Sequence, residues 1–245
     1  MANQTIQNSI DFALTYIQYS PLSAGTNNEP AITIANWTQN LVVGPPFGWA
    51  WNRGENATVS TVAGTQDYTI AVTDFGFLEK VSLTDSTGAV WDVPDVYNNL
   101  AKGIADPNKN KQGRPNSACV LQVTYGTNLK LRFIGVPDAV YLITLTYQKL
   151  VSPMSALTGG PGTWTIPPQY SDIYNNLFLG EAMSVVDDAK ANIYRQRGVT
   201  ALLAKAEGLT EMQKNAFLEQ FWARQGRQEL SGTLRTQQGN QARGV

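Results

Sequence analysis

The sequence predicts an α+β fold: a helical bundle formed by both chain ends, an inserted antiparallel β sandwich or barrel, and an extended C-terminal tail. Apolar residues recur at helical spacing in residues 1–22 and again in 165–224. Between them, residues 30–152 contain short β-branched runs that mostly alternate between apolar and polar positions. From residue 225 to 245 apolar residues almost vanish, so this segment is predicted to have no core of its own.

The first predicted element is an amphipathic helix over residues 5–18. Ile6, Ile10 and Leu14 repeat at helical spacing, and Thr5 precedes them as a candidate N-cap. Proline and glycine in residues 20–25 end the pattern. Because short helices gain most of their stability from packing, we expect this helix to pack against the C-terminal helices.

The next predicted elements are short strands rich in β-branched and aromatic residues. They cover residues 31–37, 57–63, 68–72, 78–84, 89–94, 118–126, 129–134 and 140–149. Glycine-containing turns separate several of them, at residues 64–67, 85–88, 125–128 and 135–138. Such strands and turns are typical of an antiparallel sandwich or barrel. The polar segment 95–115 interrupts the pattern and is predicted to be a long exposed loop.

Helical periodicity returns after residue 165 in three successive segments. The first segment begins near Pro168. Proline suits the first turn of a helix, because the backbone N–H that it lacks would be unpaired there anyway. The apolar face of this segment includes Leu177. A second segment has Leu202 on its apolar face. The third opens on Thr210 and Gln213, which have capping-box spacing.

The composition excludes several kinds of catalytic and metal site. There is no histidine and only one cysteine, Cys119, which excludes Ser-His-Asp and Cys-His catalysis, histidine zinc sites, thiolate clusters and an internal disulfide. Glu181, Asp187 and Asp188 are carboxylate candidates for acid–base catalysis. The two aspartates are adjacent and diverge on a helix, so a solvated helix face is the favoured interpretation. We expect no enzyme activity, no cofactor and no metal.

Charge and hydropathy favour a component of an assembly. Charged residues make up 15% of the chain, below the usual quarter, and uncharged polar residues replace them. Such a surface costs less to desolvate against a neighbouring copy. Residues 1–100 contain two bases and nine acids, whereas residues 101–245 contain sixteen bases and ten acids. Neither a signal peptide nor a run of about eighteen apolar residues is present, so we expect synthesis in the cytoplasm and no membrane contact.

Aromatic residues alternate with small residues in the stretch 44-GPPFGWAWNRG-54. Phe47, Trp49, Trp51 and Arg53 could form a contact loop for a neighbouring subunit or tail protein, since Trp and Arg dominate binding energy at interfaces. They could instead pack under the sheet, or stack on a sugar or a single-stranded nucleic acid. The contact loop is the favoured interpretation.

The C-terminal tail is basic, but its arginines are too widely spaced for a protein that recognises a specific sequence in double-stranded nucleic acid. It could face phosphates, or it could be an arm that orders when it binds a partner protein, or it could be a frayed terminus without a role. We favour the arm. Its candidate contact residues are Trp222, Arg224, Arg227, Leu230, Leu234, Arg235 and Arg243.

Four stretches in their order along the chain carry a resemblance to a known family. They are 59-VSTVAGTQDYTIAV-72, 77-FLEKVSLTDSTG-88, 129-LKLRFIGVPDAVYLITLTYQK-149 and 166-IPPQYSDIYNNLFLGEAMSVVDDAKANIYRQR-197. The order of these β stretches ahead of a helix opening on Pro-Pro resembles head-tail adaptor proteins of tailed bacteriophages, also called connector, tail-tubular or portal-adaptor proteins. The short-tailed phages are the nearest likeness.

The resemblance implies a structural virion protein at the neck of the particle. It implies a homo-oligomeric ring, a dodecamer, between the portal protein and the tail nozzle or tail-tube proteins. Double-stranded DNA would pass through its channel during ejection without sequence-specific binding. The arm would then be portal-binding. The tryptophan-containing loop and the lysine-rich insertion at residues 102–114 have no counterpart in this likeness. A carbohydrate- or receptor-binding structural module that uses the tryptophan loop is the alternative function.

Overall fold

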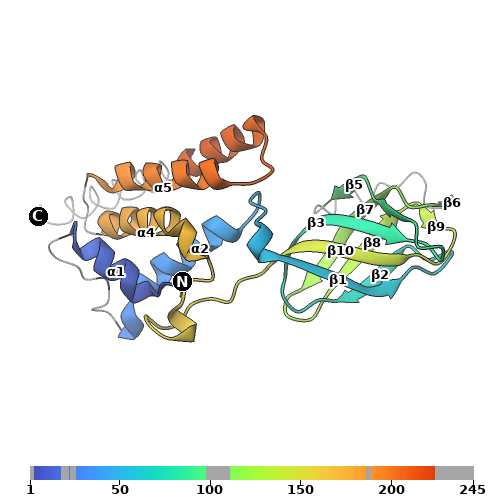
Figure 1. The fold of residues 1–245 in the computed structure, drawn as a ribbon, viewed down its shortest axis with the longest axis horizontal. Helices are drawn as coiled ribbons and strands as arrows, with labels where there is room; N and C mark the ends of the chain where they lie inside the picture. Colours follow the sequence, from blue (N-terminus) through green and yellow to red (C-terminus); the bar gives the residue numbers. More distant parts are fainter. Residues whose placement is uncertain (1–2, 18–21, 23–25, 98–110, 186–188, 224–245) are drawn as a thin grey trace, which may run out of the picture. The chain divides into compact units, whose positions relative to one another are not determined.

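The computed structural model describes residues 3–17, 22, 26–97, 111–185 and 189–223. The chain divides into two compact units, Met1–Lys205 and Ala206–Val245. The first unit mixes α-helices with sheets whose strands are mostly antiparallel (Figure 1). The α+β class is therefore confirmed.

The first helix, α1, spans Ile6–Leu14 and begins where the sequence predicts. Thr5 is its N-cap: the Asn8 amide donates to the Thr5 hydroxyl (3.4 Å), and the Thr5 amide donates to Asn8 Oδ1 (2.9 Å). Two otherwise unpaired donors of the first turn are satisfied in this way. Ile6, Ile10 and Ala13 form its buried face. The helix is shorter than predicted, and residue 18 lies outside the described residues.

The strand predicted over residues 31–37 is wrong, because the second helix, α2, spans Ala31–Val43. The β-branched residues of this run fit a strand locally, and a short apolar run cannot be assigned from periodicity alone. Ala35, Thr38 and Val42 are all buried at spacings of three and four residues, which a helix places on one face and a strand would divide between its two faces. α2 packs against both α1 and α4 (Ser171–Val185), so tertiary packing decides the conformation.

The N-terminal helix contacts α4, the first of the C-terminal helices. α1 and α4 pack together, and the Ser9 hydroxyl of α1 donates to Asn175 Oδ1 of α4 (2.8 Å). The buried Trp164 indole donates to the same hydroxyl oxygen (3.0 Å) and its ring stacks on Tyr174, with ring centroids 4.7 Å apart. Ser9 is fully buried, and these bonds satisfy it.

Two glycines let α4 approach α5 (Ala191–Lys205), which lies beside it in Figure 1. A Cβ atom added at Gly198 would lie 2.9 Å from the backbone nitrogen of Leu177. One added at Gly180 would lie 2.8 Å from the backbone nitrogen of Arg195. Backbone atoms cannot move aside as a flexible side chain can. Glycine at both positions therefore sets the close spacing of this helix pair.

Among the described residues, the strands form two four-stranded sheets and a small two-stranded one. The first sheet has the order β1-β10-β3-β4, with β1 at Arg53–Ser60, β10 at Leu142–Lys149, β3 at Phe75–Thr84 and β4 at Val90–Asp92, all antiparallel. The second has the order β2-β8-β7-β5, with β2 at Asp67–Ala71, β8 at Asn128–Ile134, β7 at Ser117–Thr124 and β5 at Asp95–Tyr97. β5 runs parallel to β7, and β6 (Gln112–Gly113) pairs parallel with β9 (Val136–Pro137).

Each predicted strand from residue 57 onward coincides with one of these strands. The four predicted turns contain Gly64, Gly88, Gly126 and Gly135, all with positive φ between 77° and 90°. Side chains from both larger sheets join in one hydrophobic cluster, to which Leu83, Leu131 and Ile143 belong. The loop predicted over residues 95–115 is corrected at its two ends, which form β5 and β6, and its residues 98–110 lie outside the described residues.

The second unit is described only over residues 206–223, of which 211–223 are helical. The predicted capping box is confirmed there. The Thr210 amide donates to Gln213 Oε1 (2.9 Å), and the Gln213 amide donates to the Thr210 hydroxyl (3.3 Å). The ring of Phe221 meets those of Phe217 and Trp222, with centroids 6.0 and 5.0 Å apart.

An ion-pair cluster on the second sheet predicts weaker stability in acid. Arg132 donates two bonds to the Asp67 carboxylate (2.7 and 2.9 Å), and Lys130 Nζ lies 3.4 Å from it. The hydrogen bonds from Arg132 hold the pKa of Asp67 below its ordinary value of 3.8. A lowered folded-state pKa means that this stabilisation is complete above the unfolded-state value and is lost as the pH falls through the folded-state value.

We therefore expect Asp67→Asn to lower the free energy of unfolding by about 1 kcal/mol at pH 6, and by almost nothing at pH 2. Urea unfolding at both pH values measures the difference. Asp92→Asn is the matched control, because its ion pair with Lys80 is exposed on both sides, and it should change little at either pH. An equal Asp67→Asn effect at pH 6 and pH 2 would contradict the assignment.

Candidate functional site

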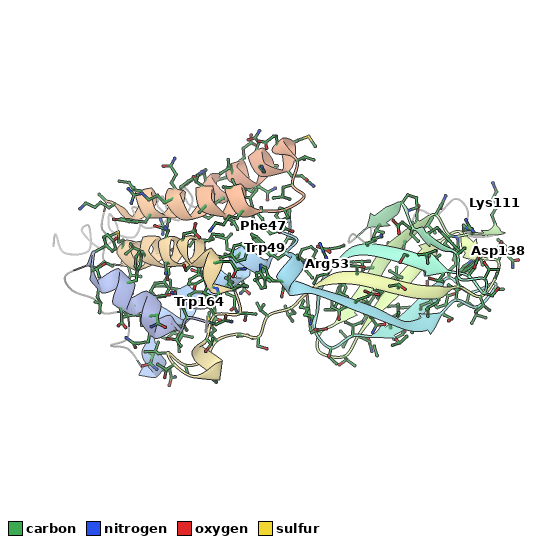
Figure 2. All side chains as sticks on the ribbon, viewed as in Figure 1. Phe47, Trp49, Arg53, Lys111, Asp138 and Trp164 are labelled. Atoms are coloured by element: carbon green, nitrogen blue, oxygen red, sulfur yellow. The ribbon has the colours of Figure 1, made fainter. Side chains whose placement is uncertain are left out.

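The segment that connects α2 to β1 is anchored by buried aromatic rings. Phe47 and Trp49 are 0% and 1% exposed. The Trp49 indole donates to the carbonyl oxygen of Val42 at the end of α2 (2.7 Å), which gives its buried N–H a partner. Figure 2 shows both rings beside the end of α2, with Arg53 following at the start of β1.

Trp49 is the centre of this aromatic group. Its ring meets those of Phe47, Trp51 and Tyr170, with centroids 6.4, 6.0 and 5.2 Å away. The interpretation as a contact loop is therefore corrected for Phe47 and Trp49, because their burial leaves no surface for a partner. Trp51 is half-buried and Arg53 is exposed, so for these two a contact role stays a prediction.

Polar side chains tie the same segment to the first sheet. Gln148 of β10, fully buried, donates through Nε2 to the Trp49 carbonyl oxygen (3.0 Å) and to Glu79 Oε1 (2.8 Å). Arg53 donates to Glu79 Oε2 (2.6 Å), and the Asn52 side chain donates to the carbonyl oxygen of Lys149 (2.9 Å). The start of β1 is thus held against β3 and the end of β10.

The returning segment after β10 is held against α2 by side-chain amides. Asn36 donates to the Met154 carbonyl oxygen (2.9 Å) and accepts from the Met154 amide (2.7 Å). Gln39 donates to the Ser152 carbonyl oxygen (3.1 Å) and is 1% exposed. Sequence reasoning missed Asn36, Gln39 and Gln148. The available signal was a polar side chain inside an apolar run, but it became informative only once α2 was known to be a helix.

Glu181, a candidate acid–base residue, forms an ion pair between α4 and α5. Arg195 Nε and Nη2 donate to its two carboxylate oxygens (2.6 and 2.9 Å), and Nη1 donates to Asn192 Oδ1 (3.2 Å). The Arg195 side chain is 5% exposed and that of Glu181 is 19% exposed. This bidentate ion pair links α4 to α5. The other two candidates, Asp187 and Asp188, lie outside the described residues.

The described residues also bear on metal binding, membrane spanning and disulfide bonding. No group of three or more His, Cys, Asp or Glu residues could hold a metal ion among these residues. No described helix is long and apolar enough to cross a membrane. Cys119 is buried and forms no disulfide.

The predicted arm is almost entirely outside the described residues. Trp222 lies on the helix at residues 211–223 and is half-buried, with its ring against Phe221. The remaining predicted arm residues, from Arg224 to Arg243, are not described. Their role therefore stays a prediction.

Known proteins and protein families provide an independent comparison for the sequence of this chain. None of the curated proteins compared with the chain matches it. A sequence model of the SU10 adaptor protein family matches residues 13–237. The match covers α2, α4, α5 and every strand that the structure describes. The family match supports assignment as a phage head-tail adaptor, in agreement with the resemblance found in four stretches of the sequence. Since the matched region is most of the chain, this protein belongs to the SU10 adaptor protein family.

Proposed function

We propose that the chain is a structural protein of a tailed-phage particle, where it acts as a head-tail adaptor. The observation that carries this proposal is the family match over residues 13–237, which includes helices, both larger sheets and most of the basic tail. Side-chain hydrogen bonds hold residues 47–53 and 148–154 in fixed positions. Such a rigid connection suits a protein that joins two neighbouring proteins.

In its finer form, the proposal is a ring of copies, a dodecamer, in the neck of a short-tailed phage between the portal and the tail nozzle or tail-tube proteins. The helices would form a bundle on the portal side, and the two sheets would form a sandwich on the tail side. DNA would pass through the centre without sequence-specific contacts. The acidic balance of residues 1–100 supports this, since like charge keeps DNA from adhering to the channel wall.

The proposed portal contact is the C-terminal arm. Trp222 and the arginines at 224, 227, 235 and 243 combine an aromatic anchor with well-spaced charge. Such residues are favoured where a segment orders on a protein surface. Leu230 and Leu234 add apolar contacts at helical spacing.

The alternative, a carbohydrate- or receptor-binding module, is not favoured. It needs tryptophan faces open to a ligand, whereas Phe47 and Trp49 are buried and serve the junction between α2 and β1. Trp51 alone offers little stacking area.

Binding to the purified portal tests the proposal. We expect native mass spectrometry of the full-length chain mixed with its phage's portal ring to show a stable complex with many copies of the chain. The joint variant Arg227→Gln/Arg235→Gln should lose most of that binding, whereas Arg197→Gln, an exposed arginine of α5, should bind like the wild type. Absence of the wild-type chain from both the portal complex and purified particles would refute the adaptor function. Normal binding of the joint variant would refute only the arm.

A further inference from the structure

The helices and the sheets of the first unit share little packing surface. No described helix packs extensively against a described strand, whereas α4 packs on α5 and β10 packs between β1 and β3. Two connections run between the described helices and strands: residues 44–52 ahead of β1, and residues 150–170 after β10. Regions joined without a large apolar interface normally move relative to each other. Any fixed position of the helices relative to the sheets therefore depends on these connections.

Strand β3 carries an extra residue where it lies beside the first connection. Residues 146 and 147 of β10 pair with Lys80 and Leu78, so Glu79 between them has no partner in β10. An extra residue of this kind is a β-bulge, which redirects a side chain out of the regular alternation of the strand. The Glu79 carboxylate lies close to the backbone of the connection, since a Cβ atom added at Gly48 would be 2.5 Å from Oε1.

A polar cluster surrounds this carboxylate at the start of β1. We call it the junction cluster, and it consists of Arg53, Glu79, Gln148 and the carbonyl oxygen of Trp49. Gln148 Nε2 donates to Glu79 Oε1 (2.8 Å) and to the Trp49 oxygen (3.0 Å). Arg53 Nε donates to Glu79 Oε2 (2.6 Å), and Arg53 pairs with Gln148 in the register of β1 and β10. The cluster therefore joins three strands of the first sheet to Trp49, whose ring is anchored beside α2 (Figure 2).

The second connection is bonded to the first at the same place. The Asn52 side chain donates to the Lys149 carbonyl oxygen (2.9 Å), and the Asn52 amide donates to the Trp49 carbonyl oxygen (3.0 Å). The Leu150 amide donates to the carbonyl oxygen of Asp74, next to β3 (2.7 Å). Because the two connections are bonded to each other and to the sheet, neither can turn without breaking hydrogen bonds of the other.

Gln148 carries a cost that an apolar residue would avoid. Its side chain is 0% exposed, and its Oε1 accepts no hydrogen bond from the described residues. The amide nitrogen must face Glu79 and Trp49, since both present acceptors, so Oε1 points away from them. A buried acceptor without a donor lowers stability. Such a group can still specify one arrangement over others, as a buried asparagine does in a coiled coil.

We propose that the junction cluster is an orientation lock, which holds the first sheet in one position relative to α2 and depends on Gln148. Without the Gln148 amide, the chain keeps its helices and sheets, and these two regions move about the two connections. The lock lies within a single chain, so it is independent of the proposed adaptor function. A displacement of the helices is passed to the sheets only while the lock is closed.

The distribution of distances between two spin labels tests the lock. Double electron–electron resonance is measured on the purified full-length chain in a Cys119→Ala background. One label is at Thr33→Cys, exposed on α2, and the other is at Val90→Cys, 64% exposed on β4. With the junction cluster intact we expect one narrow distribution. Adding Gln148→Leu should make it roughly twice as wide or more, with unchanged circular dichroism.

A matched control separates loss of orientation from loss of stability. Ile143 lies in the same strand as Gln148 and is buried in the hydrophobic cluster between the sheets, away from the junction cluster. Ile143→Val should lower the urea midpoint and leave the width of the distance distribution unchanged.

Three results would overturn the lock. They are a wide distribution with the junction cluster intact, an unchanged width in folded Gln148→Leu, and a width in Ile143→Val equal to that in Gln148→Leu. Gln148→Leu takes a donor from the Glu79 carboxylate, which can prevent folding. In that case Gln148→Leu/Glu79→Gln, which also removes the charge, is measured against the same criteria.

Discussion

Trp49→Ala is expected to lower the free energy of unfolding by about 3–5 kcal/mol, because it removes a large buried ring. Trp49 is 1% exposed and contacts Phe47, Trp51 and Tyr170. Its loss would leave a cavity between α2 and the start of β1, and the Val42 carbonyl oxygen would lose the indole donor. Equilibrium urea unfolding of the purified full-length chain measures the effect.

Two further variants separate packing from hydrogen bonding at this position. Trp49→Phe keeps most of the ring and loses the N–H donor, so we expect a loss of about 1–2 kcal/mol. Trp51→Ala is the matched control, since Trp51 lies in the same segment but is only half-buried, and it should cost less than half as much as Trp49→Ala. Equal losses for Trp49→Ala and Trp51→Ala would show that Trp49 is not the anchor of the segment.

Arg195→Ala is expected to lower the free energy of unfolding by about 3–5 kcal/mol. The guanidinium group is buried between α4 and α5 and donates two bonds to Glu181. Removing it leaves the Glu181 carboxylate partly buried without its cation, which costs more than the lost attraction alone. Urea unfolding followed by far-ultraviolet circular dichroism reports the change in the helices.

The partner substitutions define what Arg195 contributes. Arg195→Met/Glu181→Leu removes both charges and keeps the volume, so it should be closer to the wild type than Arg195→Ala. Arg197→Ala, two residues further along the same helix, removes an exposed arginine that lies over the Tyr194 ring and should cost less than about 1 kcal/mol. If Arg197→Ala proves as damaging as Arg195→Ala, the buried ion pair is not what holds α4 to α5.

The candidate site shows where local sequence information stops. The alternation of Phe47, Trp49 and Trp51 marked the segment as unusual, but the same alternation suits a contact loop, a core segment or a ligand platform. Only the positions of Val42, Gln148 and Tyr170 around Trp49 decide among them. Glu181 likewise looked like a possible acid–base group until Arg195, fourteen residues later, proved to be its partner.

Sequence alone determined the features that depend on neighbouring residues. The Thr5 and Thr210 caps, the glycines of the four turns and the strand periods from residue 57 onward all follow from interactions within a few positions. Tertiary structure alone decided α2, the burial of Trp49 and the close contact at Gly180 and Gly198. These depend on residues far apart in the chain, because a segment that suits a strand locally becomes a helix when its buried face must fit between α1 and α4.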